Sequence, residues 1–150
     1  MLLAYDGKRA YHNRTGLGNY SRTLVESLAR YYPAHTYYLC NPKPSTFYIP
    51  PYPNIYEVKP RRWLDRKLSS IWRSKTVVRD LVKLDIDCYH GLSFEIPFGI
   101  QKTNIYSVVS VPDLIFERYP SLYNPIDVRI YRKKTKYACE HADRIIAISE

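Results

Sequence analysis

Two glycines in residues 15–21, Gly16 and Gly18, stand directly before an apolar pattern that is typical of a helix. Glycine lets the backbone approach a ligand closely, and the free N–H groups that begin a helix attract an anion. The segment therefore suits the binding of a phosphate group. The alternative is a turn whose glycines serve only the geometry of the chain.

Two common phosphate-binding motifs fit this segment poorly. Ser21 stands where a dinucleotide fingerprint has its third glycine, and about ten residues separate Asp6 from Gly16, too many for the tight turn of that motif. The second predicted strand ends at Cys40 and Asn41, without an acidic residue to hold a ribose hydroxyl. A P-loop is excluded because no Gly-Lys-Ser/Thr sequence follows the glycines.

The elements that must position this segment alternate along the chain. Apolar and β-branched runs predict strands, and apolar steps of three and four predict helices between them. The first helix is expected to begin at Asn19 as its N-cap and to end before Pro33. The predicted strands are residues 2–5, 36–40, 55–58, 86–89, 105–111 and 145–148, and the later helices are residues 62–83, interrupted near Lys75, and 127–141. Residues 42–60 are rich in proline and predict a surface loop that encloses one strand.

This alternation predicts one Rossmann-like α/β domain over residues 1–150, with a doubly wound and mostly parallel sheet. Functional groups in such sheets lie at the carboxyl ends of the strands. We therefore expect the glycine segment and the residues that follow the later strands to line one edge of the sheet.

The composition indicates which kind of partner and which cellular compartment to expect. Lys and Arg number 23 against 14 Asp and Glu, so the net charge is +9 and an acidic partner is expected. The three cysteines have no metal-binding spacing, which argues against zinc or a disulfide framework and favours the reducing cytoplasm. No apolar run approaches the roughly 20 residues that span a bilayer.

Much of the positive charge lies in residues 59–83, where both tryptophans are interleaved with basic residues. Basic residues at helical spacing beside tryptophan suit the headgroup layer of an anionic membrane. The alternative is a solvated helix face with Trp63 and Trp72 in the core. A nucleic-acid partner is disfavoured because no recognition motif is present. The predicted membrane-binding residues are Arg62, Trp63, Arg66 and Arg73.

Four segments, in order, resemble the N-terminal domain of the family 4 glycosyltransferases of the GT-B fold, also called glycosyl transferases group 1. Residues 6–9 and 15–20 resemble the family's Asp-x-Arg and Thr-Gly-Ile-Gly-Arg-Tyr opening. Residues 87–91 are similar to its Asp-Val-Tyr-His segment, and 108–120 to its Val-x-His-Asp-Leu stretch. Residues 141–150 resemble its Ala-Asp-x-Ile-Ile-x-Val-Ser-Glu element.

The resemblance implies transfer of a sugar, with retention of configuration, from a nucleotide diphosphate sugar to a glycan or a lipid-linked acceptor. The matching domain would hold the acceptor, and a donor-binding C-terminal domain is absent from this chain. Gly16 and Gly18 would lie against the diphosphate or sugar of the donor. No metal and no cofactor besides the donor is implied, and the expected location is cytoplasmic, with peripheral contact to the inner face of the membrane.

One departure from the family affects the catalytic candidate. The family's His-Asp pair is replaced here by Pro112 and Asp113, so Asp113 is the catalytic candidate, and a helix-capping role is its alternative. Arg9 and His90 are the acceptor-binding candidates. A solvated loop charge is the alternative for Arg9, and a structural histidine for His90. Two other functions stay open: a non-catalytic membrane- or partner-binding module, and a nucleic-acid-binding α/β domain.

Overall fold

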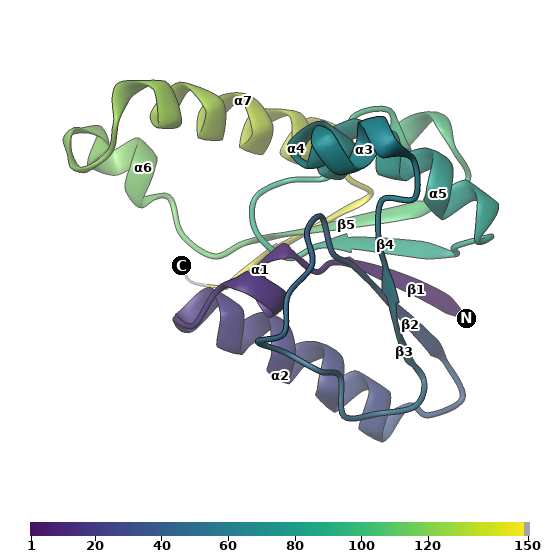
Figure 1. The fold of residues 1–150 in the computed structure, drawn as a ribbon. Helices are drawn as coiled ribbons and strands as arrows, with labels where there is room; N and C mark the ends of the chain where they lie inside the picture. Colours follow the sequence, from purple (N-terminus) through teal and green to yellow (C-terminus); the bar gives the residue numbers. More distant parts are fainter. Residues whose placement is uncertain (149–150) are drawn as a thin grey trace.

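Six parallel strands form the centre of the computed structural model, which describes residues 1–148 (Figure 1). Their order across the sheet is β3-β2-β1-β4-β5-β6, and every neighbouring pair is parallel. The predicted doubly wound, parallel α/β class is therefore confirmed. The strands are β1 (Leu2–Asp6), β2 (Thr36–Cys40), β3 (Ile55–Val58), β4 (Cys88–Gly91), β5 (Tyr106–Val111) and β6 (Arg144–Ala147).

Helices cover both faces of this sheet (Figure 1). On one face, α1 and α2 bury Ala10 and Val25 against Tyr37 and Leu39 of β2. The opposite face is covered by the helices of residues 59–83, called the basic segment, and by α7. Trp72 lies in the hydrophobic core beneath these helices. The helices are α1 (Lys8–His12), α2 (Gly16–Tyr31), α3 (Trp63–Lys67), α4 (Ser69–Ile71), the π-helical turn η1 (Trp72–Thr76), α5 (Val77–Lys83), the 3₁₀ turn η2 (Ile100–Lys102), α6 (Ile115–Arg118), the 3₁₀ turn η3 (Pro120–Leu122) and α7 (Pro125–His141).

The winding of the chain reverses between β1 and β4. The chain runs outward from β1 to β3 and then crosses to β4 on the other side of β1. Ligands of such sheets bind at the carboxyl edge beside this reversal. In this chain that edge is formed by the ends of β1 and β4, at Asp6 and Gly91, together with the end of β5 at Val111.

The first long helix begins earlier than predicted. Its first residue is Gly16 and its N-cap is Thr15, so the expected N-cap, Asn19, lies inside the helix. The Asn13 side chain causes this shift, because its Oδ1 accepts hydrogen bonds from the backbone N–H of Thr15 at 2.8 Å and of Gly18 at 3.1 Å. The residues between the first predicted strand and the glycines, for which no helix was predicted, also contain a short helix, α1.

The basic segment divides into more pieces than the predicted interruption near Lys75. Leu68, with φ −105° and ψ 49°, separates α3 from α4, and the π-turn η1 then leads into α5. Each break rotates the following side chains around the helix axis. Arg62 and Arg66 are exposed whereas Arg73 is buried, so the three arginines do not share the solvated face expected from their helical spacing.

Candidate functional site

Ser110 joins three elements at the carboxyl edge. Its Oγ lies 2.9 Å from Nε2 of His90 on β4 and 3.1 Å from the hydroxyl of Tyr20 on α2. Ser110 itself, on β5, is completely buried. The helix that carries the two glycines therefore meets the ends of β4 and β5 at one point, as expected for a shared edge.

His90 is held as a neutral imidazole at this point. Burial lowers its pKa from 6.5 to about 4. The Tyr5 ring lies beside it, with 5.8 Å between the ring centroids. At neutral pH His90 therefore offers a hydrogen-bond donor or acceptor and no charge, which suits contact with a hydroxyl-rich ligand.

The two glycines differ in their surroundings. A Cβ on Gly18 would lie 1.8 Å from the carbonyl oxygen of Asn13, so only glycine fits where α2 crosses the end of α1. The Gly18 N–H is also already bonded to Asn13 Oδ1. Gly16 is exposed, and a Cβ there would meet nothing within 4 Å. Gly18 is thus required for packing, while Gly16 leaves open space at the start of the helix.

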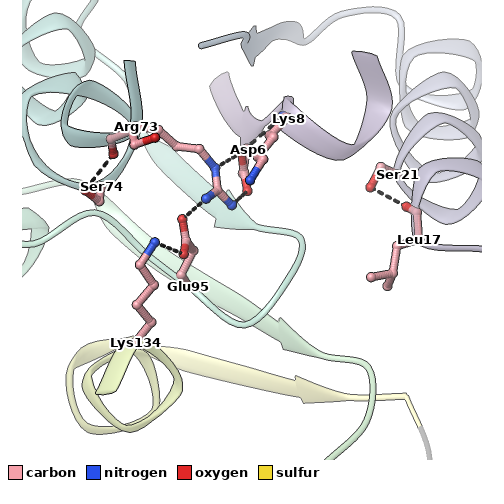
Figure 2. Close-up of polar contacts among 9 residues, drawn as sticks. Asp6, Lys8, Leu17, Ser21, Arg73, Ser74, Glu95 and Lys134 are labelled. Atoms are coloured by element: carbon pink, nitrogen blue, oxygen red, sulfur yellow. Dashed lines mark hydrogen bonds and ion pairs between the residues drawn. The ribbon is translucent and has the colours of Figure 1, made fainter. Parts of the chain in front are cut away.

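A buried chain of charges runs behind this edge (Figure 2). Arg73 of η1 donates from Nε to Asp6 Oδ1 at 2.9 Å and from Nη2 to Asp6 Oδ2 at 2.5 Å, and it also pairs with Glu95. Glu95 Oε2 lies 2.6 Å from Nζ of Lys134 on α7. The side chains of Asp6, Arg73 and Glu95 are only 1%, 10% and 13% exposed. Arg73 is therefore structural, and its predicted place on a membrane-binding surface is wrong.

Asp6 is ionised in spite of its burial. Burial by itself would raise the pKa of this carboxyl, but the charge and hydrogen bonds of Arg73 hold it below its ordinary value. The backbone N–H of Lys8 also donates to Asp6 Oδ1 at 3.2 Å. The bidentate pair thereby fixes the end of β1 to the π-turn.

Positive charge gathers just beyond Asp6. Burial lowers the pKa of Lys8, and the neighbouring charges of Arg73 and Arg9 lower it further. Arg9, the predicted acceptor-binding residue, is half-buried in α1, and its Nε has no hydrogen-bond partner within residues 1–148. Asp6 and Glu95 act in the opposite direction and partly offset these positive charges.

Asp113 follows the end of β5 and has a structural contact. Its Oδ1 accepts a hydrogen bond from the Ile115 N–H at 3.0 Å, directly before α6. It also lines a hollow of about 660 Å³ at the carboxyl ends of β5 and β6, together with Val111 and Ala147. The N-cap of α6 is Leu114, which makes no side-chain cap hydrogen bond, so Asp113 is not the N-cap expected as an alternative, and its catalytic role stays a prediction.

The predicted membrane-binding residues separate into two groups. Trp63 is 68% exposed, and Arg62 and Arg66 are exposed beside it. Leu64 and Leu68 add apolar surface, with 61% and 51% exposure. No helix within residues 1–148 is long and apolar enough to cross a membrane. An apolar and basic strip is thus exposed on α3, without Arg73.

Two residues of this edge, Ser110 and Glu95, were not predicted from the sequence. Ser110 is one of two serines in the otherwise apolar strand β5, and that polar position near the end of the strand was the available signal. Glu95 lies in an irregular segment with no periodicity to mark it, and its partners Arg73 and Lys134 come from distant elements. Within residues 1–148, no group of three or more His, Cys, Asp or Glu side chains is placed to hold a metal ion.

Comparison of the chain with protein-family models, with curated proteins and with solved structures finds no match.

Proposed function

We propose that this chain is the acceptor-binding domain of a retaining glycosyltransferase, which moves a sugar from a nucleotide diphosphate sugar to a glycan or a lipid-linked acceptor. The observation that supports this most is the meeting of α2, β4 and β5 at Ser110. Gly16 begins the helix that carries Tyr20, and His90 and Ser110 lie near the ends of β4 and β5, so these contacts support a shared edge that also includes the Asp113 segment. That is the arrangement which the sequence resemblance requires.

The side chains of this edge suit a saccharide. Neutral His90 can exchange hydrogen bonds with sugar hydroxyls, and Lys8 and Arg9 can hold an anionic group of the acceptor. Gly16 leaves room for a phosphate at the start of α2. Catalysis in the complete enzyme would rest on positioning and on electrostatic stabilisation of the departing diphosphate. The donor-binding groups would come from a second domain, so this chain alone is expected to transfer no sugar.

Binding to this edge can be tested by NMR. Titration of the ¹⁵N-labelled chain with neutral oligosaccharides and lipid-linked saccharides should shift the amides of Gly16, His90 and Ser110. His90→Ala should abolish the shifts, whereas Lys102→Ala, at an exposed position before β5, should leave them unchanged. Shifts confined to other surfaces, or turnover of a sugar nucleotide by this chain alone, would contradict the proposal.

A second candidate function is peripheral docking to an anionic membrane at the cytoplasmic face. Trp63, Leu64 and Leu68 are exposed beside Arg62 and Arg66, and this is the composition of an interfacial surface. It is compatible with a lipid-linked acceptor, and it would also serve a non-catalytic membrane-binding module. Co-sedimentation with phosphatidylserine vesicles tests it, and binding that is equal with neutral vesicles would contradict it.

A further inference from the structure

A basic hollow of about 580 Å³ lies beside the edge strand β3, bordered by α3 and α5. We call it the basic hollow. Six basic side chains and two acidic ones contribute to its lining, so positive charge predominates. It lies three strands away from β4 in the sheet order, and it shares no lining residue with the group formed by His90, Ser110 and Tyr20.

Several of its cations are not neutralised. Lys59 is paired with Glu57 at 2.7 Å, and Arg79 is paired with Asp65 at 2.7 Å. By contrast, three other lining cations make no side-chain hydrogen bond or ion pair with any residue in the range 1–148. These three are Arg61, Arg62 and Lys83. Cations without partners around one hollow favour an anionic occupant.

Two tyrosines supply an aromatic surface in the same hollow. Tyr38 and Tyr56 are opposite one another in the β2–β3 register, and their ring centroids lie 5.7 Å apart at an interplanar angle of 31°. Tyr56 is 53% exposed. An exposed tyrosine ring offers an apolar face with a polar tip, on which the C–H face of a sugar ring can pack.

We propose that the basic hollow binds an anionic saccharide, one that carries carboxylate or phosphate groups. The guanidinium groups of Arg61 and Arg62 match such groups with paired hydrogen bonds, and Tyr56 takes the ring. The volume lies within the range of small-molecule sites. This site does not depend on the proposed function, because a module that transfers no sugar could bind the same ligand.

A neighbouring hollow gives a longer saccharide room to extend. This second hollow, of about 310 Å³, shares Lys59, Pro60 and Arg66 with the first. It also includes Asn41 and Lys43, which follow the carboxyl end of β2. An acidic oligosaccharide held at β3 would therefore point toward the carboxyl edge of the sheet.

Calorimetric titration tests the proposal with defined probes. The carboxylate probe is a hyaluronan tetrasaccharide, the phosphate probe is glucose 6-phosphate, and maltotetraose is the neutral control. At least one acidic probe should bind more than about tenfold more tightly than maltotetraose, a difference that calorimetry resolves. Tyr56→Ala and the double variant Arg62→Ala/Lys83→Ala should each weaken that binding by about tenfold or more. Arg129→Ala/Lys133→Ala, which removes the same charge from exposed positions on α7, should not weaken it.

Four results would overturn the proposal. They are the absence of binding by both acidic probes, binding that Tyr56→Ala leaves unchanged, inorganic phosphate binding as tightly as the acidic probe that binds, and an oligothymidylate of equal charge binding more tightly than the tetrasaccharide. The last result would assign the hollow to single-stranded nucleic acid, which also uses cations and aromatic stacking. Circular dichroism of each variant establishes that it is folded.

Discussion

The two tryptophans belong to one basic segment, yet their surroundings are opposite. Trp63 on α3 is 68% exposed beside Arg62 and Arg66. Trp72 on η1 is completely buried, and its Nε1 donates to Asp80 Oδ2 at 2.7 Å. The arginines adjacent to the two tryptophans differ in the same way, since Arg62 is exposed and Arg73 is inside the charge network. Residue type therefore did not decide which of these side chains face the solvent, and nine residues of helix turn the chain by about half a turn between the two tryptophans.

The largest expected difference is in stability. Trp72→Ala should lower the free energy of unfolding by about 3–5 kcal/mol, because removing a completely buried indole leaves a cavity and takes the hydrogen-bond donor from Asp80 Oδ2. Trp63→Ala should change it by no more than about 0.5 kcal/mol, since the side chain is mostly in water. Urea unfolding of both variants measures the difference. Equal losses would contradict the opposite placement of the two rings.

Substitutions of the buried Arg73 and the exposed Arg62 should differ in the same way. Arg73→Ala should cost about 3–5 kcal/mol of unfolding free energy, because the buried Asp6 would lose its ion-pair partner and Glu95 would keep only Lys134. Arg73→Lys should lose less, since a charge stays but the bidentate geometry does not. Arg62→Ala is the matched control and should be nearly neutral. A neutral Arg73→Ala would show that the network is exposed to solvent.

Membrane binding should depend on the exposed arginines of the basic segment, Arg62 and Arg66, and not on the buried Arg73. Each basic residue near an anionic surface contributes about 1 kcal/mol, so Arg62→Ala/Arg66→Ala should weaken binding to phosphatidylserine vesicles by about 30-fold. Arg129→Ala/Lys133→Ala, on α7, removes equal charge and should have a smaller effect. If the two double variants bind equally, net charge explains the binding and α3 is no specific surface.

The smallest expected effect is on acid stability. The pKa of Asp6 is lower in the folded chain than its ordinary value of 3.8, so its contribution is present above pH 3.8 and is lost as the pH falls through the folded value. Asp6→Asn should flatten this part of the unfolding free energy against pH. Arg62→Ala should leave its slope unchanged. A slope that is the same in wild type and Asp6→Asn would place the acid sensitivity elsewhere.

The sequence predicted the layers of the fold better than the details of the site. Strand and helix patterns predicted the parallel sheet, and the shared edge followed from the rule on strand ends. The start of α2 was wrong because a side-chain contact from Asn13 moved it to Gly16. The burial of Arg73 was missed because it depends on Asp6 and Glu95, which are distant in sequence and meet only in the folded chain. Long-range pairing of this kind leaves no periodic signal.

The pKa of His90 tests most directly whether α2, β4 and β5 form one edge. We predict a value of about 4 by NMR titration of the imidazole, because Tyr5 and Ser110 contact the ring, Tyr20 contacts Ser110, and burial keeps the ring neutral. Stability should correspondingly decline as the pH falls below 6.5 toward 4, since only the unfolded chain gains the proton over that interval. Tyr20→Ala, which opens one side of the contact, should move the value upward. A pKa near 6.5 in the wild type would contradict the account, because His90 would then lie in water and the three elements would not meet.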